Sequence, residues 1–586
     1  MSKTLQLVHN PSLFGSTAAD KVRGLTRLKE QGVGGIVTNV AFKGYLTSED
    51  GWRELLDLLS ACRTVNMRVW IYDERGYPSG SAGGLVLAND PDLEARAMAL
   101  DEGRVFEERP YEGTHNCHNY HERRRYINLL DRRATAEFVN VTHRRYRSRL
   151  DGRYWPVEAF FTDEPALNTV NLGTLPEAAE KTLPIHDQPD PNKKRCPMIP
   201  WSDALAGQVD PAPIFSDAPA ARSAKRDYYR RVADAVSENY FGQIQEWCHD
   251  NGTLSSGHLL QEENILDHAE LYGNALRCLM RMDIPGIDVL DSNPAASFRH
   301  SHRAALLASS AAMLNGTRRI MTEVSDFMQR MDENRLAEVP AMQATAAWQA
   351  ALGVTEFTLY YSWDIPDPNP FLPAEVRKKG LFRPAAEYLE YNRFVTALVE
   401  QLEPCRLVPD VFLYYPIELV QEQIVPSELP RSRIQFSARL QAIRDSFNRA
   451  MLELLRAGVV PCLVDEAMIR SAEMRDDGIH ILNACAQAIV FPKDCVPPGM
   501  TAEWEFSENT PQALFAAGKT RMVNQGPSVF VAAMEAADEL VFTCVNLDKN
   551  PQTCGFRTRS GVENLPLGGY ETTVLRRPKG AMSPKR

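Results

Sequence analysis

The chain has 586 residues, 44% of them hydrophobic and 24% charged, which is typical of a folded protein and too long for one ordinary core. The net charge of −11 argues against a nucleic-acid partner, because neutralising phosphates needs a basic face. No run approaches the roughly 20 consecutive apolar residues that cross a bilayer, so no membrane span is predicted.

The N-terminus and the cysteines indicate in which cellular compartment the protein is expected. The first residues lack the apolar core and the cleavage site of a signal peptide. The 11 cysteines are an odd number without CxxC spacing, which predicts a reduced, cytoplasmic protein. The sequence leaves a monomer and a homo-oligomer both open.

Short apolar runs rich in β-branched and aromatic residues alternate with segments of helical period up to about residue 400. The predicted strands are 5–9, 34–40, 67–74, 157–165, 254–260, 286–291, 319–326 and 356–363. Apolar strands that alternate with helices indicate a parallel sheet covered on both faces. Eight such units predict a (β/α)8 TIM-type barrel over residues 1–402, with an open doubly wound sheet as the alternative.

Two polar segments interrupt this pattern. Residues 171–222 are rich in proline, favour neither helix nor strand, and follow the fourth strand, so we interpret them as an insertion that covers the substrate. The run HNCHNYH at 115–121 contains His115, Cys117, His118 and His121. Its spacing matches no zinc pattern, so a polar surface loop is predicted there and no metal ligand is assigned.

The pattern changes beyond residue 402. Residues 403–500 alternate strand and helix and predict a small, flavodoxin-like α/β domain, without the glycine motifs of nucleotide sites. Residues 501–586 carry short alternating runs that predict a β-sandwich.

Polar residues stand where the predicted barrel strands end. They are His9, Asn39, Asp73, Glu74, Asp163, Glu164, His258, Glu262, Glu263, Asp288, Asp291, Glu323, Tyr361 and Trp363, with Tyr77 in the Gly-rich loop after Glu74. The carboxyl ends of barrel strands converge on one cavity, so these residues predict a crowded acidic pocket. Burying so much like charge is costly unless sugars, cations or protons balance it.

Glycoside hydrolysis needs one carboxylic acid to protonate the leaving oxygen and a second carboxylate as nucleophile or base. Glu164 is the predicted acid, because neighbouring charges such as Asp163 would raise its pKa. Glu262, Glu263 and Glu323 compete for the partner role. The alternatives are helix N-terminal charges for Glu262 and Glu263 and a hydroxyl-binding or salt-bridged acid for Glu323. The other strand-end residues are predicted to bind substrate, with Trp363 either a stacking platform or ordinary core.

Several segments occur in an order that resembles a known family. They are WIYDERGYPSGSAGG (70–84), YINLLDRRATAEFVNVTHRRY (126–146), FFTDEP (160–165), SSGHLLQEEN (255–264), RIMTEVSD (319–326) and YYSW (360–363). Over about residues 5–400 the chain resembles glycoside hydrolase family 106, the α-L-rhamnosidases and relatives of unassigned specificity. The resemblance implies a (β/α)8 barrel, inverting hydrolysis of α-L-rhamnosides and a calcium ion near the sugar hydroxyls. It also implies that Glu164 is the acid and Glu262 or Glu263 the water-activating base.

The sequence therefore predicts a glycosidase that releases a terminal sugar, rhamnose or a related deoxy sugar, from an oligosaccharide or small glycoside. The residues themselves require no cofactor. One alternative is a metal-dependent carbohydrate lyase or epimerase on the same barrel, using His258 with Asp or Glu ligands. The other is a catalytically silent sugar-binding protein, since a barrel fold alone does not select among these classes.

Overall fold

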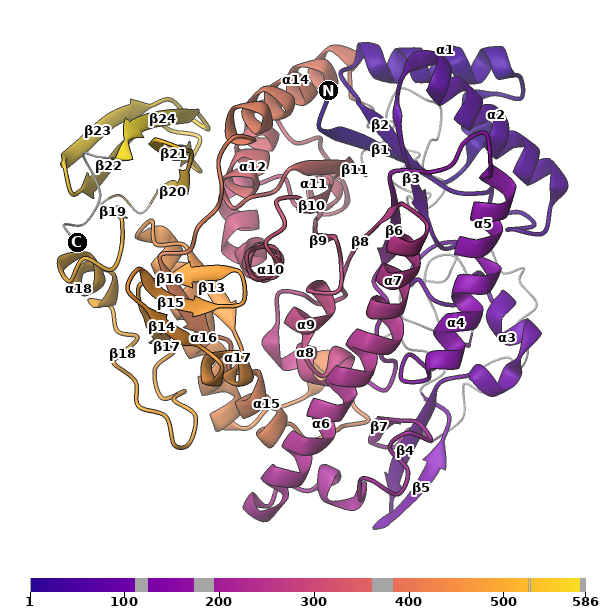
Figure 1. Ribbon diagram of the computed structural model, residues 1–586, viewed down its shortest axis with the longest axis horizontal. Helices are drawn as coiled ribbons and strands as arrows, with labels where there is room; N and C mark the ends of the chain where they lie inside the picture. Colours follow the sequence, from indigo (N-terminus) through magenta and orange to yellow (C-terminus); the bar gives the residue numbers. More distant parts are fainter. Residues whose placement is uncertain are drawn as a thin grey trace.

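The computed structural model describes residues 2–110, 125–172, 194–360, 383–524, 526 and 528–579. Eight parallel strands close into a barrel (Figure 1). They are β1 (Thr4–Val8), β2 (Gly35–Thr38), β3 (Arg68–Tyr72), β6 (Ala159–Asp163), β8 (Leu254–His258), β9 (Ile284–Val289), β10 (Met321–Val324) and β11 (Glu356–Leu359). The barrel closes because β1 pairs with both β2 and β11. The predicted (β/α)8 fold is confirmed, and each barrel strand lies within or overlaps a predicted range.

Helices follow every barrel strand and surround the barrel (Figure 1). They are α1 (Ala18–Glu30), α2 (Glu49–Val65), α3 (Leu85–Asn89), α4 (Arg132–Val141), α5 (His143–Leu150), α6 (Arg222–Val236), α7 (Gln243–Asp250), α8 (Ile265–Tyr272), α9 (Ala275–Leu279), α10 (Pro294–Asn315), α11 (Phe327–Met331), α12 (Val339–Ala351) and α14 (Ala385–Leu402). A π-helical segment, Ser237–Gly242, joins α6 to α7.

Local capping fixes where the long helices begin and end. Thr17 and Asp20 form a reciprocal capping box at the start of α1. The Asn293 side chain accepts from the Ala296 amide at the start of α10, and Gly316 ends that helix in a left-handed conformation. Helices α10 and α12 are rich in alanine and almost wholly buried, because the C-terminal part of the chain covers the side that faces away from the barrel.

A small antiparallel sheet was not predicted. Strands β4 (Arg96–Asp101) and β5 (Arg104–Glu108) form a hairpin, and β7 (Met198–Trp201) adds to its free edge in the order β5-β4-β7. The Pro-rich segment was expected to contain no strand. β7 forms because β4 supplies a ladder, and Pro200 is tolerated because β7 is an edge strand. The segment also has short 3-10 turns at Ala212–Phe215 and Pro219–Ala221, and residues 173–193 lie outside the described part.

The chain then enters a parallel sheet of order β13-β12-β17-β18. Its strands and helices are β12 (Val411–Tyr414), α15 (Ile417–Gln423), α16 (Ala438–Arg456), β13 (Pro461–Val464), α17 (Glu466–Arg470), β17 (Ile489–Phe491), β18 (Trp504–Glu505) and α18 (Thr510–Ala516). A three-stranded antiparallel sheet of β14 (Glu473–Arg475), β15 (Gly478–Ile481) and β16 (Ala484–Ala486) extends from it. Because β18 joins the parallel sheet, we propose that this α/β region continues to α18.

A C-terminal β-sandwich ends the chain, as predicted. One sheet has the order β19-β22-β23 and the other β20-β21-β24. The strands are β19 (Met522–Asn524), β20 (Val529–Glu535), β21 (Glu539–Asn546), β22 (Gln552–Thr558), β23 (Gly561–Leu567) and β24 (Thr572–Pro578). Side chains from both sheets, including Phe542 and Phe556, share one core.

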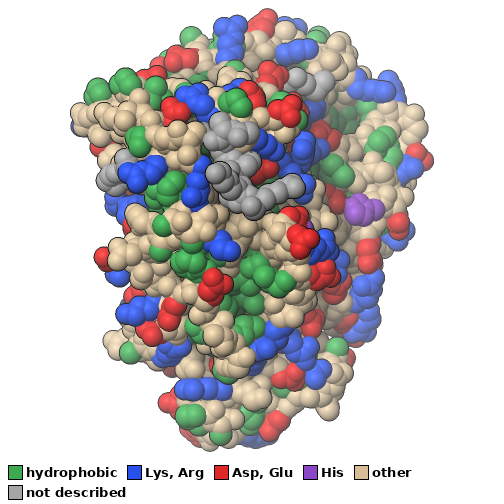
Figure 2. Space-filling view, turned by 60° about the vertical axis from the view of Figure 1, so that its left-hand side comes forward, with side chains coloured by type: hydrophobic (Ala, Val, Ile, Leu, Met, Phe, Trp, Pro, Cys, Tyr) green, Lys and Arg blue, Asp and Glu red, His purple; other side chains and the backbone are tan. Residues whose placement is uncertain are grey.

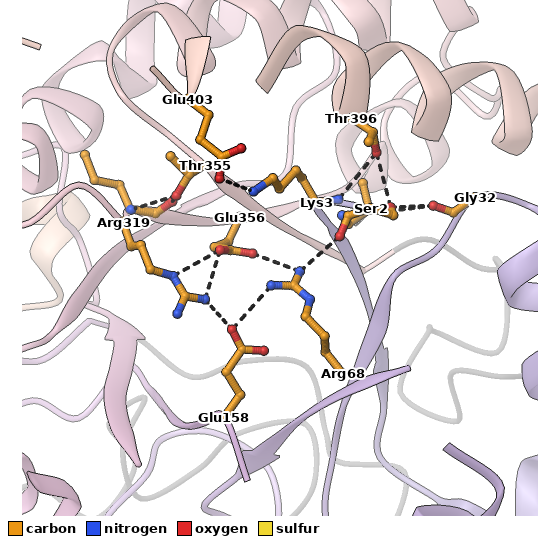
Figure 3. A network of polar contacts seen from close by, with 12 residues as sticks. Ser2, Lys3, Gly32, Arg68, Glu158, Arg319, Thr355, Glu356, Thr396 and Glu403 are labelled. Atoms are coloured by element: carbon orange, nitrogen blue, oxygen red, sulfur yellow. Dashed lines mark hydrogen bonds and ion pairs between the residues drawn. The ribbon is translucent and has the colours of Figure 1, made fainter. Parts of the chain in front are cut away.

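An ion-pair network closes the barrel at the amino ends of its strands (Figure 3). The Arg319 guanidinium lies 2.6 Å from Glu158 and 2.9 Å from Glu356, and Arg68 lies 2.9 Å from the other Glu356 oxygen. The opposite charges of these residues pair with one another, so we interpret this end as structural and look for chemistry at the opposite end.

Acidic and basic side chains intermingle over the described surface in Figure 2, without a broad basic stretch. Among the described helices, none has the length and apolar character required to cross a membrane.

Candidate active site

Side chains inside the barrel change from apolar to ionisable along the strands. Phe161, Ile284 and Met321 belong to one apolar cluster that fills the barrel. Since side chains alternate between faces, Asp163, Asp288 and Glu323 point to the same interior, two or four residues nearer the carboxyl ends. The apolar layer is therefore the floor of an acidic site.

His258 joins the strands of this site. Its Nε2 lies 3.2 Å from Glu323 Oε2 and 3.5 Å from Asp163 Oδ1. Asp163 is the direct neighbour of His258 across the β6–β8 ladder, and its other oxygen accepts a 2.6 Å hydrogen bond from the Tyr72 hydroxyl. The barrel strands thus hold the side chains of Asp163 and Glu323, both able to carry protons, in contact with the His258 imidazole.

The site retains protons at neutral pH. Burial, followed by the charge of Glu164, raises the pKa of Glu323 to about 8. Burial also raises the pKa of Asp163 to about 8; His258 opposes this shift, and the charges of Glu323 and Glu164 add to it. Burial and Glu323 raise the pKa of Asp288 well above its ordinary value. Buried carboxyls that raise one another's pKa in this way can hold the proton that acid catalysis needs.

Glu164 follows strand β6 directly and has a strained backbone. Its φ of 49° is unusual for a residue with a side chain, and more so before a proline, Pro165. The Glu164 amide donates to the His258 carbonyl at 3.3 Å, which ties this turn to β8. Left-handed backbone of this kind costs about 1–3 kcal/mol and persists where the surroundings fix it. Glu164 is half-buried, whereas Glu323 is 7% exposed, so Glu164 lies nearer the solvent.

Glu262 and Glu263 lie in the turn after β8. Glu262 is buried, neither of its carboxylate oxygens has a hydrogen-bond partner among the described residues, and Oε1 lies 3.9 Å from His258 Nδ1. Burial and the charge of Glu263 raise the pKa of Glu262 well above its ordinary value. Burial raises the pKa of both Glu262 and Glu323, so these shifts do not separate the two as candidate partners of Glu164. The two acids differ in their contact with His258, which lies 3.2 Å from Glu323 and 3.9 Å from Glu262. Burial also raises the pKa of Glu263, while Arg303 opposes the shift.

Glu74 organises the Gly-rich loop that follows β3. Its carboxylate accepts hydrogen bonds of 2.5–3.1 Å from the backbone amides of Arg75, Gly80, Ser81, Ala82 and Gly83. This ring of donors explains why an apolar strand is followed by an acid and then by small residues. Although Glu74 was predicted to bind substrate, its carboxylate faces the loop.

Asp73 faces away from the barrel interior. The Ser79 hydroxyl donates to it at 2.6 Å, and His143 Nε2 of α5 lies 3.9 Å from its second oxygen. Burial raises the pKa of Asp73 well above its ordinary value and lowers the pKa of His143 to about 3. Asp73 is fully buried, so the structure places it in the wall rather than in the cavity.

The remaining predicted residues fall into three groups. His9 packs edge-on against Tyr72 at 4.6 Å, on the side of the site near β1. Asn39 donates to the Glu74 carbonyl at 2.6 Å, and Asp291 accepts from the Asn293 amide at 2.8 Å and from Gln329 at 2.6 Å, so both hold loops. Tyr77 is half-buried in the Gly-rich loop, and Tyr361 and Trp363 lie outside the described residues.

Tyr72, Ser79 and His143 were missed from the sequence. Tyr72 could have been found, because it lies two residues after Trp70 at the end of a strand and therefore shares the interior face with it. The roles of Ser79 and His143 depend on contacts between distant segments, which spacing does not reveal.

The described residues do not fit the calcium ion that the family resemblance implies. Calcium takes six to eight oxygen ligands. Among the described His, Cys, Asp and Glu residues, the group close enough to hold an ion is Asp477, His480 and Cys485, away from the barrel.

No protein-family model matches the chain, and no curated protein matches its sequence. Solved structures match its fold. A rhamnosidase from Novosphingobium sp. PP1Y gives a TM-score of 0.50 at 12% identity over 77% of this chain and 48% of that one. A cold-adapted β-galactosidase from Rahnella sp. R3 gives 0.59 at 10% identity over 98% of both chains. A catalytic mutant of a family 42 β-galactosidase from G. stearothermophilus gives 0.58 at 9% identity over 98% of both.

These matches concern the overall fold of the chain. The chain spans about half the length of the rhamnosidase and nearly the whole length of the two β-galactosidases. At these identities they show a shared fold, a barrel with further α/β and β domains, that known glycoside hydrolases use.

Proposed function

We propose that this protein is a glycoside hydrolase that releases a terminal sugar, with Glu164 as general acid and Glu323 as the partner carboxylate. The observation that carries the proposal is that Asp163, Glu164 and Glu323 gather at the carboxyl ends of the fourth and seventh barrel strands, where burial and the charge of Glu164 raise the pKa of both Glu323 and Asp163. Two carboxyls, one that protonates the leaving oxygen and one that acts as base or nucleophile, are the minimum equipment for glycosidic cleavage.

The different exposure of the two acids assigns their roles. In a pocket that takes a terminal sugar, the sugar lies deep and the leaving group points to solvent. Glu164, nearer the solvent, is suited to protonate the leaving oxygen, and Glu323, at the floor, is suited to assist attack at the sugar. His258 Nε2 contacts both Glu323 and Asp163, at 3.2 and 3.5 Å, and helps to hold their orientation.

We further propose inversion, in which Glu323 activates a water molecule, as the resemblance implies. A base works best when its pKa lies near the working pH, and burial raises the pKa of Glu323 toward that range. NMR of the sugar that is first released separates this route from retention, because the spectrum shows whether the anomeric configuration has been inverted or retained.

Terminal α-L-rhamnose, or a related deoxy sugar, is the proposed substrate class. The ordered motifs from WIYDERGYPSGSAGG to YYSW support it, as does the rhamnosidase fold match. The β-galactosidase matches make a β-D-galactoside the second sugar to test. We also propose a reducing, cytoplasmic setting, because the ten cysteines in the described residues are free thiols.

A panel of aryl glycosides that includes α-L-rhamnoside and β-D-galactoside tests the proposal. Turnover of one member, lost in Glu164→Gln and Glu323→Gln, is expected. The exposed Glu246, paired with Arg132 at 3.4 Å, provides Glu246→Gln as a control that keeps activity. Sugar binding without turnover in the wild type would instead indicate a silent binding protein.

A further inference from the structure

The three-stranded sheet β14-β15-β16 carries a group of metal-ligating side chains far from the barrel site. Its register places Glu473 opposite His480, and His480 opposite Cys485. Directly opposed residues of antiparallel strands share one face, with Cβ atoms about 4.5–5.5 Å apart. An imidazole and a thiol are therefore neighbours by strand pairing rather than by chance rotamers.

Asp477 completes the group from the turn between β14 and β15. Its Oδ1 lies 2.8 Å from His480 Nε2. One ligand atom from each of Asp477, His480 and Cys485 lies within 4.8 Å of the other two. The backbone supports this arrangement, because the Asp477 carbonyl accepts from the Gln487 side chain at 2.7 Å and lies 3.8 Å from Cys485 Sγ.

We propose that Asp477, His480 and Cys485 bind one Zn²⁺ ion, with a water molecule as the fourth ligand. Zinc prefers thiolate, imidazole and carboxylate ligands in a tetrahedral arrangement. At the usual bond lengths of about 2.0–2.3 Å, such ligand atoms lie ~3.3–3.8 Å apart, which small side-chain rotations reach from the observed spacing. On binding, the Cys485 thiol releases its proton to solvent, and the thiolate and the Asp477 carboxylate balance the two charges of the ion.

The place of the hairpin indicates a structural role for this ion. Asn483, in the turn between β15 and β16, donates from its side chain to the Leu314 carbonyl at 2.9 Å, near the end of α10. The hairpin therefore joins the α/β region to a barrel helix. A zinc ion that links the β14–β15 turn to β16 would stiffen this connection and raise the thermal stability of the whole chain.

Metal titration of the purified full chain after chelator treatment tests the proposal. Co²⁺ is the spectroscopic probe, because a thiolate ligand gives a charge-transfer band that His and Asp alone do not give. We expect one Co²⁺ per chain with this band, its displacement by Zn²⁺, and a rise in Tm with Zn²⁺. Cys485→Ser should abolish the band, and both Cys485→Ser and His480→Gln should weaken Zn²⁺ binding at least about tenfold.

Two control variants separate this site from others. His249 pairs with Asp283 at 2.7 Å, outside the β14-β15-β16 sheet, so His249→Gln should leave the band and the affinity unchanged. Cys117→Ser tests the HNCHNYH run in the same way. A wild type without the band, a band that survives in Cys485→Ser, or a band lost in Cys117→Ser would overturn the assignment. None of these measurements uses glycosidase activity, so their results do not depend on whether the proposed function is correct.

Discussion

His258 Nε2 lies 3.2 Å from Glu323 Oε2, and this contact joins the fifth and seventh strands of the barrel across its interior. The same nitrogen lies 3.5 Å from Asp163 on the fourth strand. One imidazole therefore links the strand that Glu164 follows to the strand that carries Glu323, and both His258 and Glu323 affect the pKa of Asp163.

Replacing Glu164 with Gln should lower kcat about 10²–10⁴-fold on substrates with a poor leaving group, because the proton donor is lost. Aryl glycosides with an acidic phenol need little protonation and should lose much less. Rates for a series of phenols measure the difference. Equal losses across the series would contradict the assignment of Glu164 as the acid.

Replacing His258 with Gln should move the pH profile of kcat/KM as well as lower it. His258 opposes the upward shift in the pKa of Asp163, so its loss raises that pKa further. The limb of the profile that reports the carboxyl cluster should then move to higher pH. A uniform loss at every pH, with the limb unmoved, would indicate only a structural role for His258.

The contribution of Asp163 and Glu323 to stability should fall as the pH rises from about 4 to 8. Burial raises the pKa of both Asp163 and Glu323 to about 8 in the folded chain, above their values of about 4 when unfolded. The folded state therefore binds more protons, and its stabilisation is complete below the unfolded pKa and lost as the pH passes the folded pKa. Tm measured from pH 5 to 9 checks this, and Glu323→Gln should flatten the slope. Equal pH slopes of Tm in the wild type and in Glu323→Gln would contradict the shift at Glu323.

Replacing Glu74 with Gln should destabilise the protein by about 3–5 kcal/mol, the range for breaking a buried charged network. The new amide group would oppose backbone donors that now surround a carboxylate. Urea unfolding of Glu74→Gln beside Glu246→Gln measures the cost. A loss below 1 kcal/mol would show that the loop does not depend on this charge.

Gly257 permits the close pairing of β8 with β6. A Cβ at Gly257 would lie 2.1 Å from the Thr162 carbonyl oxygen, and its φ of 151° disfavours a side chain. Gly257→Ala should cost at least about 3 kcal/mol, since the backbone would have to move. Gly252 has a positive φ of 69° with open space around it, so Gly252→Ala isolates the conformational cost. Equal Tm losses in the two variants would show that the clash is relieved without cost.

The barrel and the identity of its acids were predictable, because buried parallel strands are apolar along their length and the polar residues that end them stand out. Asp163, His258, Asp288 and Glu323 all lie on the interior face at one end. The roles within the set were not predictable. Whether an acid such as Glu74 faces the cavity or its own loop depends on backbone amides six to nine residues further along. Strand β7 was missed because its pairing partner, β4, lies about 100 residues earlier.

The most direct test of the central claim is the hydrolysis of the best aryl glycoside by the wild type, Glu323→Gln and Glu246→Gln. We predict that Glu246→Gln retains wild-type kcat/KM, and that Glu323→Gln keeps its fold and sugar binding but loses kcat about 10³-fold or more, as expected for a lost base or nucleophile. Wild-type kcat in a folded Glu323→Gln variant would show that the chemistry does not use the acid at the floor of the barrel.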